Sequence, residues 1–211
     1  MKKLAIIGTR SFSHTIAHYA TETNEFEFVG YFDDIEPQGT IINGYPVLGK
    51  VDEAENAYKK GVFDEIFIGV GYTRFDLREQ YFNSLKGKIP FANIIMPDAK
   101  IDSTVKLGEG VFVGSGTTIY MDTVIEDNVF LRGSNYIGHD NVIKSHTYVS
   151  GRLNTAGHCI VGERCFLGVC ACVKDHTEIC DDVWVGIGSL VLKDITVPGK
   201  YMPIAKLVKV D

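Results

Sequence analysis

The chain has 211 residues, of which 45% are hydrophobic and 23% are charged, and its net charge is -6 at pH 7. These values are typical of a globular protein, and the acidic balance argues against a nucleic-acid-binding surface, which is normally basic. The apolar run Leu4–Ile7 is too short for a signal peptide core, and no apolar run has the length of a membrane span. We therefore predict a cytoplasmic protein without nucleic-acid or membrane partners.

Residues 1 to about 95 alternate strand-like and helix-like stretches. The predicted strands are KLAIIG (3–8), FEFVGYFDD (26–34), DEIFIGVG (64–71) and FANII (91–95). The predicted helices are FSHTIAHYATET (12–23), VDEAENAYKKG (51–61) and TRFDLREQYFNSLKG (73–87). This alternation predicts a small parallel sheet with helices packed on it. Ligands of such sheets bind beyond the carboxyl ends of the strands, which here are Gly8–Ser11, Asp33–Asp34 and Gly69–Tyr72.

A different periodicity begins after Pro97. Every sixth residue from Ile101 to Val197 is aliphatic, with the single exception of Thr155. The position four residues later is usually small or aliphatic, and Gly often follows the aliphatic residue. A six-residue repeat of this length predicts a parallel β-helix in which the aliphatic residues point inward. We therefore expect three segments: 1–96, 97–200 for the β-helix, and a C-terminal tail, 201–211.

The cysteines have a simple explanation within this repeat. All five lie between Cys159 and Cys180, and an odd number without a secretion signal argues against a disulfide framework. A zinc site from Cys165, Cys170 and Cys172 is disfavoured, because their spacing contains no CxxC pair. Cys159 and Cys165 fall at the small inward position, which favours packing. We predict no metal site.

The chain resembles the left-handed β-helix acyltransferases built from hexapeptide repeats. It is most similar to the sugar acetyltransferases of the nucleotide-linked amino-sugar N-acetyltransferase and sialic-acid O-acetyltransferase type. The stretches that carry this resemblance are YFDD, IIMPDAKIDSTVKLGEGVFV, IGHDNVI and VGERCFLGVCACV. The resemblance covers nearly the whole chain. It implies a Rossmann-like domain before the β-helix, three hexapeptides per triangular coil, a homotrimer with active sites between subunits, and acetyl-CoA as the co-substrate.

His139 and Asp140 match the family's catalytic histidine and the acidic residue that follows it. A histidine titrating near neutrality suits a base that removes a proton from a sugar amine. The sequence around His139 taken alone also fits a solvated turn residue, but the family pattern implies that His139 is the general base and Asp140 orients its ring. If each coil has eighteen residues, Gly157 stacks next to His139 and leaves open space there, and His158 stacks between Asp140 and His176.

The family pattern also implies where acetyl-CoA binds. Gly157 is a candidate for a backbone N–H that stabilises the oxyanion, and glycines let the pantetheine arm approach the backbone closely. The expected cofactor-binding residues are Gly157, His158, Gly168, Gly186, Gly188 and Lys206. An alternative explanation of His158 is that it is an exposed residue paired with Asp140 and does not contact acetyl-CoA. The ending YMPIAKLVKVD matches the family's C-terminal motif only partly.

Nucleotide-sugar binding is expected at the strand ends of the N-terminal domain. The family has a glycine-rich loop after the first strand, whereas this chain has GTRSFSH and keeps only Gly8. Arg10 offers charge to a pyrophosphate, and Asp33 and Asp34 offer acceptors to a base or ribose. The expected substrate-binding residues are Gly8, Thr9, Arg10, Ser11, Asp33, Asp34 and Gly71. An NAD site is disfavoured because GxGxxG is absent. The small domain could also be only a packing element.

The function that the sequence predicts is acetyl-CoA-dependent N-acetylation of a nucleotide-linked amino-dideoxy sugar, as in polysaccharide biosynthesis. The acetyl group would pass directly to the amine, without a covalent acyl-enzyme at Cys165, Cys170 or Cys172. Two alternatives remain open at this level. One is O-acetylation or transfer of another acyl group on the same scaffold, and the other is a non-catalytic scaffolding protein.

Overall fold

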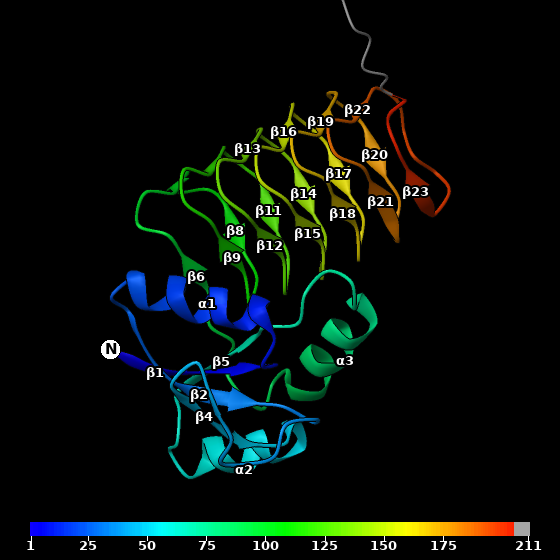
Figure 1. Ribbon diagram of the computed structural model, residues 1–211. Coiled ribbons are helices and arrows are strands. Elements are labelled where there is room, and N and C mark those ends of the chain that lie inside the picture. The colour runs from blue at the N-terminus through cyan, green and yellow to red at the C-terminus, as the bar shows by residue number, and fades with distance from the viewer. Residues whose placement is uncertain (205–211) are drawn as a thin grey trace, which may run out of the picture.

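The computed structural model describes residues 1–204, which form an N-terminal α/β part and a long β-helix (Figure 1). The N-terminal sheet has five strands in the order β3-β4-β2-β1-β5. Its strands are β1 (Lys2–Ile7), β2 (Phe26–Phe32), β3 (Ile41–Ile42), β4 (Tyr45–Gly49) and β5 (Glu65–Ile68). They pair in parallel, except that β3 is antiparallel to β4. The predicted α/β fold class is confirmed.

The helices cover both faces of this sheet, because residues along β1 alternate between two apolar clusters. Leu4 and Ile6 pack with Ile16 of α1 on the face toward the β-helix, and Ala5 and Ile7 pack on the opposite face. The opposite face is covered by α2 and α3. The helical elements are α1 (Ser11–Glu22), a 3₁₀ turn (Val51–Glu53), α2 (Ala54–Lys59) and α3 (Phe75–Leu85). None of the helices within residues 1–204 is long and apolar enough to cross a membrane.

Two details of the N-terminal sheet differ from the prediction. FANII is not its fourth strand: Phe91 makes only an isolated bridge to Ile66, and β6 (Ile94–Ile95) pairs with β9 (Phe112–Val113) of the β-helix. The fourth parallel strand is instead β4, which enters through the short hairpin with β3. The strand pattern of FANII is real, but a five-residue apolar run does not indicate which sheet it joins.

The β-helix consists of two- and three-residue strands stacked in three flat faces (Figure 1). Face 1 contains β7 (Lys100–Ile101), β10 (Thr118–Ile119), β13 (Tyr136–Ile137), β16 (Asn154–Thr155), β19 (Cys172–Val173) and β22 (Leu190–Val191). Face 2 contains β8 (Lys106–Leu107), β11 (Val124–Ile125), β14 (Val142–Ile143), β17 (Ile160–Val161) and β20 (Glu178–Ile179). Face 3 contains β6, β9, β12 (Phe130–Leu131), β15 (Tyr148–Val149), β18 (Phe166–Leu167), β21 (Val183–Val185) and β23 (Gly199–Tyr201).

The predicted coil of three hexapeptides agrees with the pairing register. Ile119 pairs with Ile137, and Ile137 pairs with Thr155, so neighbouring coils are eighteen residues apart. The inward positions from Val113 to Val191 are buried, as the six-residue repeat predicts. With the pairing and burial described, the prediction of a left-handed parallel β-helix is confirmed at the level of the fold.

The repeat fails at its last predicted position. Val197 was expected to point inward, but it is 63% exposed. Ile195 takes the inward place and bridges to Ile179, and Val183 pairs with Gly199, so the final coil is two residues shorter. Pro198 lies in this shortened turn. After this shortened coil the chain forms β23, which is the last strand of face 3.

Face 3 carries a ladder of aromatic side chains that joins the two parts of the molecule. Neighbouring rings in the ladder stack nearly parallel, with centroids 3.9 to 5.8 Å apart; the members are Phe112, Phe130, Tyr148, Phe166 and Trp184. Phe12 and Tyr19 of α1 and Tyr72 pack against this ladder. Outward residues of a β-helix are normally solvated, so this face is apolar because the N-terminal part covers it.

Candidate active site

His139 and Asp140 lie where the chain turns from face 1 to face 2, directly after β13. Asp140 adopts a left-handed backbone conformation, with φ 55°. His139 Nδ1 is 2.7 Å from Asp140 Oδ2, and both side chains are about half exposed. The Asp140 carboxylate accepts a hydrogen bond from the Nδ1–H of the neutral ring, which leaves the Nε2 lone pair free. The geometry therefore provides an oriented imidazole that can act as a base.

Gly157 stacks next to His139, as the eighteen-residue register predicts, but the space there is occupied by the histidine ring itself. A Cβ at Gly157 would lie 2.5 Å from His139 Cε1 and 2.6 Å from Nε2. Only glycine therefore permits this position of the ring. Among the hydrogen bonds of the described residues, the Gly157 N–H donates none, so it is available to a ligand beside the imidazole.

His158 lies beside the same pair on the next coil. Its Nε2 is 3.9 Å from Asp140 Oδ2, its ring meets the His139 ring edge-on at 5.1 Å, and it stacks on His176 at 4.7 Å. The column Asp140–His158–His176 forms as predicted. The donor atoms of His139, Asp140 and His158 lie within 4.8 Å of one another. We call the turns between face 1 and face 2 that hold these residues the histidine corner.

The other glycines predicted to contact acetyl-CoA lie at a different corner, between face 3 and face 1, which we call the glycine corner. A Cβ at Gly168 would clash with the backbone of Gly186, and a Cβ at Gly186 would clash with Met202 Sδ. Close packing of successive turns therefore suffices to explain these two glycines. Gly188 has φ 66° and open space around it. Lys206 lies outside the described residues.

The expected substrate-binding residues gather around one cleft of about 470 Å³ at the strand ends of the N-terminal sheet. Its lining includes Gly8, Arg10, Ser11, Asp33, Asp34 and Gly71. Thr9 does not line the cleft; its side chain is buried behind it and donates a hydrogen bond to Asp33 Oδ2 at 2.8 Å. The topology thus brings together three segments that are far apart in the sequence.

The N-terminus of α1 opens into this cleft without a cap. Arg10 at the N-cap position makes no side-chain capping bond, and the first turn contains no acidic residue. Free N–H groups at a helix N-terminus attract anions, and the exposed Arg10 adds a positive charge. Although GTRSFSH lacks the glycines of the family loop, this end of the cleft is suited to phosphate groups.

Asp33 and Asp34 already have partners within the protein. Asp33 accepts hydrogen bonds from Thr9 and from the N–H groups of Ile35 and Glu36. Asp34 accepts bonds from the Val51 N–H and the Tyr81 hydroxyl. Burial raises the pKa of Tyr81, and the bond to Asp34 raises it further. The two carboxylates therefore shape the rim of the cleft as well as offering acceptors to a ligand.

Sequence reasoning named Tyr72 only as the end of a strand segment and missed the aromatic ladder beside it. Tyr72 lines the cleft and also a groove of about 500 Å³ along face 3 and the glycine corner. Its ring lies 4.8 Å from those of Tyr148 and Phe166. Trp184 belongs to the same groove. A ring every eighteen residues from Phe112 to Trp184 was the available signal, and it is visible only once the coil length is known.

The comparisons with known proteins agree with this architecture. Residues 3–85 match the family model described as the PglD N-terminal domain. The acetyltransferase domain of PglB from Neisseria gonorrhoeae is 25% identical, with a TM-score of 0.83 over 96% of this chain and 97% of that chain. That domain has also been solved in complex with acetyl coenzyme A.

A second structural relative is perosamine N-acetyltransferase from Caulobacter crescentus, solved with CoA and GDP-perosamine as a variant in which a histidine is replaced by asparagine. It is 25% identical, with a TM-score of 0.83, and covers 100% of this chain and 98% of that chain. Among curated proteins, UDP-3-O-acylglucosamine N-acyltransferase of Herminiimonas arsenicoxydans is 39% identical over 109 residues. That match spans 48% of this chain and 31% of the relative.

These likenesses bear out the resemblance predicted from the sequence, and the two structural relatives are acetyltransferases that have been solved with CoA or acetyl coenzyme A. Residues 3–85, which match the PglD N-terminal domain model, precede a hexapeptide-repeat left-handed β-helix, and this arrangement is similar to that of the acetyltransferases named above.

Proposed function

We propose that this chain is an acetyl-CoA-dependent N-acetyltransferase that acts on the amino group of a nucleotide-linked amino-dideoxy sugar. The observation that carries the proposal is the histidine corner, where Asp140 holds the His139 imidazole and Gly157 leaves room for the ring. It is supported by relatives of the same architecture whose names state sugar N-acetylation and whose structures contain CoA or acetyl-CoA.

His139 Nε2 acts as the general base. Asp140 fixes the tautomer in which Nδ1 carries the proton, so Nε2 can take a proton from the sugar nitrogen as the amine attacks. Acetyl-CoA supplies an activated thioester carbonyl. The new C–N bond forms, the C–S bond breaks, and the proton held at Nε2 is returned to the departing thiolate. The Gly157 N–H, which has no acceptor among the described residues, would donate to the oxyanion. No nucleophile from the protein is needed.

Two sets of residues would hold acetyl-CoA. At the histidine corner, Gly157 has an N–H without an acceptor among the described residues, and His158 presents an exposed ring next to Asp140. On the glycine corner, Gly188 has open space around it, and Gly168 and Gly186 remain candidates. The nucleotide sugar would bind in the N-terminal cleft, with its diphosphate near Arg10, Ser11 and the α1 N-terminus. Gly8, Gly71, Asp33 and Asp34 would surround the rest of the nucleotide.

The same reaction implies an assembly and a location. Face 1 and the histidine corner expose large apolar side chains: Tyr120, Met121, Tyr136, Leu190 and Leu192. Exposed apolar side chains of this size are typical of a surface that another chain covers, and this supports a homotrimer with the active sites between subunits. Acetyl-CoA and nucleotide sugars are cytoplasmic metabolites, and this supports the cytoplasm as the place of action.

A second candidate is transfer of a longer acyl group on the same scaffold. It is favoured by the curated relatives, which match about half of this chain and are named UDP-3-O-acylglucosamine N-acyltransferases. O-acetylation uses the same base and differs only in the acceptor atom, so the products must distinguish it from N-acetylation.

The test is CoA thiol release from acetyl-CoA with UDP-, dTDP- and GDP-linked amino sugars, followed by mass spectrometry of the product. We expect an N-acetylated product with one acceptor class and a decrease in kcat of at least about 10²-fold in the His139→Ala variant. His14→Ala, on α1 and away from the histidine corner, is the control. Near-normal turnover in His139→Ala would refute the base assignment, and acyl transfer only from a longer-chain donor would favour the second candidate.

A further inference from the structure

Arg78 of α3 is a fully buried cation without a counter-charge. Its exposed fraction is 0%, and it is the largest of the fully buried side chains. Burial lowers the pKa of Arg78 to about 10, so the guanidinium is still charged at neutral pH. No carboxylate of the described residues forms an ion pair with it. Burying an unpaired charge is unfavourable, so a role beyond general stability is needed to explain it.

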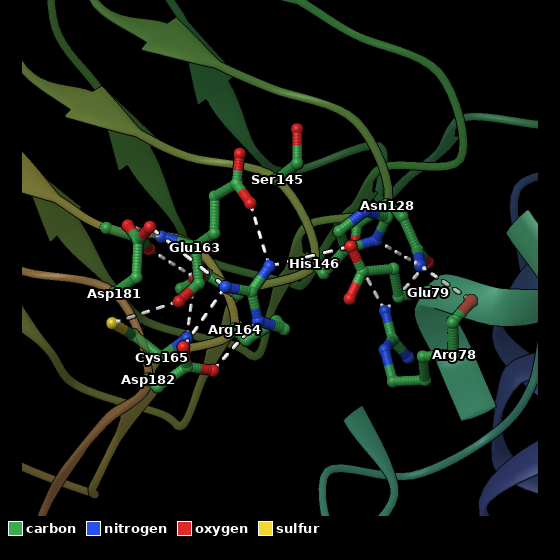
Figure 2. Close-up of polar contacts among 12 residues, drawn as sticks. Arg78, Glu79, Asn128, Ser145, His146, Glu163, Arg164, Cys165, Asp181 and Asp182 are labelled. Atoms are coloured by element: carbon green, nitrogen blue, oxygen red, sulfur yellow. Dashed lines mark hydrogen bonds and ion pairs between the residues drawn. The ribbon is translucent and has the colours of Figure 1, made fainter. Parts of the chain in front are cut away.

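The guanidinium donates to two separate parts of the chain, Val70 and Asn128, and Figure 2 shows its contact with Asn128. One arm, Nη1, donates to the carbonyl oxygen of Val70 at 2.8 Å. The other arm, Nη2, donates to both the carbonyl oxygen and the side-chain Oδ1 of Asn128, each at 2.8 Å. Nε has no partner among the described residues. The planar fork of arginine is suited to fixing two acceptors in a defined relation.

Val70 belongs to the wall of the N-terminal cleft. It begins the segment Val70–Arg74, which lines the cleft, and Tyr72 in this segment also reaches the aromatic ladder of face 3. The segment connects β5 to α3 and contains no regular structure of its own. Without the bond from Arg78, the Val70 carbonyl would have no hydrogen-bond donor in the described part of the chain.

Asn128 provides a rigid attachment on the β-helix. It is fully buried and has φ 53°, and its backbone N–H donates a hydrogen bond to the carbonyl oxygen of Glu109. Its side-chain Nδ2 lies 3.0 Å from Nδ1 of His146 on the following coil, as Figure 2 shows. Arg78 thus links the cleft segment to Asn128, which is itself hydrogen-bonded to the neighbouring coils of the β-helix.

We propose that Arg78 is a positioning residue for nucleotide binding. It holds Val70–Arg74 at a fixed distance from the β-helix, so that the cleft is preformed and its ligand lies in register with the coils that carry the histidine corner. This inference rests on the proposed function, in which the cleft binds a nucleotide diphosphate. A binding segment that is already ordered loses less conformational entropy when the ligand binds, so the ligand binds more tightly.

The neighbouring residue provides a matched control. Glu79, also on α3, forms an ion pair with Arg164 Nη1 of the β-helix at 3.5 Å. Glu79→Gln therefore weakens a contact between the same two parts of the molecule without touching Val70. If Arg78 were only a connection between domains, Arg78→Met and Glu79→Gln would affect binding alike.

The experiment measures binding of UDP, GDP and dTDP by calorimetry in the full chain, in Arg78→Met, Arg78→Lys and Glu79→Gln. We expect at least about tenfold weaker binding of the preferred diphosphate in Arg78→Met, an intermediate value in Arg78→Lys, and a change of less than about twofold in Glu79→Gln. Thermal unfolding of each variant shows that it is folded. Equal affinities in Arg78→Met and the wild type would overturn the proposal.

Hydrogen exchange of the backbone at residues 69–74 separates this inference from the proposed function. We expect faster exchange there in Arg78→Met, but not in Glu79→Gln. Unchanged exchange in Arg78→Met would refute the positioning role, whatever the ligand. Failure of the wild type to bind any of the three diphosphates would instead refute nucleotide binding by the cleft.

Discussion

Gly157 lies against the His139 ring, and a side chain at this position would displace the ring rather than the backbone. A Cβ in Gly157→Ala would lie 2.5 Å from His139 Cε1. Because the imidazole can swing away, we expect a change in melting temperature of only a few degrees. The misplaced base should lower kcat about 10²-fold, as measured by CoA thiol release.

Gly138→Ala is the matched control for that prediction. Its Cβ would lie 2.4 Å from the carbonyl oxygen of Ala156, which belongs to the rigid backbone of the next coil. We therefore expect Gly138→Ala to reduce thermal stability strongly. Equal loss of stability in both variants, with equal activity per folded molecule, would contradict the distinction.

Because two imidazoles lie beside Asp140, we predict that added transition metals inhibit the enzyme activity. His139, Asp140 and His158 present donor atoms within 4.8 Å of one another, and zinc binds two nitrogens and one oxygen readily. The sequence predicts no resident metal, but we expect added Zn²⁺ to bind at this corner and to inhibit transfer by taking the His139 ring and Asp140 as ligands. Calorimetry with ZnCl₂ should show the site in the wild type and in His176→Gln, and its loss in His158→Gln. Binding that persists in His158→Gln would refute it.

At the scale of the elements, Thr155 explains the single break in the aliphatic repeat. It is inward and buried, and its hydroxyl oxygen accepts bonds from the Gly138 N–H at 3.1 Å and from Asn141 Nδ2 at 2.6 Å. The coil that carries His139 is therefore tied to the next coil by a hydrogen bond inside the β-helix. The polar residue therefore stands where the Gly138 N–H, next to His139, needs an acceptor.

Thr155→Val should destabilise the protein, although valine suits the repeat better. It leaves the buried Gly138 N–H without an acceptor, which costs about 1–3 kcal/mol. Thr155→Ser keeps the acceptor and removes one methyl group, so we expect a smaller loss of about 1 kcal/mol. Urea unfolding compares the two. A valine variant as stable as the wild type would show that this acceptor is dispensable.

For the whole molecule, the contact between the two parts predicts a pH dependence of stability. His146 is 5% exposed, packs edge-on against Phe82 of α3, and has its pKa lowered to about 4 by burial and by the charges of Arg78 and Arg164 (Figure 2). The unfolded chain therefore binds a proton near pH 6.5, which the folded chain does not bind until about pH 4. Stability should decrease as the pH falls through this window.

The size of this effect is at most about 1.4 kcal/mol per pH unit, so the total has an upper limit of roughly 3 kcal/mol. Carboxylates also titrate at the acid end, and the comparison with His146→Gln isolates the histidine. The free energy of unfolding should decrease less steeply between pH 6.5 and 4 in His146→Gln than in the wild type. Parallel slopes would show that His146 is not protonated on unfolding.

Much of the architecture is determined by local patterns in the sequence. The alternation of elements predicted the parallel sheet because each strand and helix has its own periodicity, and the six-residue repeat predicted the coils because every turn buries the same kind of residue. The family resemblance implied the pairing of His139 with Asp140, and it implied the eighteen-residue coil that places Gly157 next to His139.

Only the tertiary structure decided what depends on contacts between distant segments. It placed Ile94–Ile95 in the β-helix rather than in the N-terminal sheet, and Ile195 rather than Val197 in the core of the last coil. It also revealed the bond from Arg78 to Val70 and the contact of Tyr72 with face 3. The physical reason is that periodicity indicates only which side of an element is buried. Which other element packs against that side depends on the path of the whole chain.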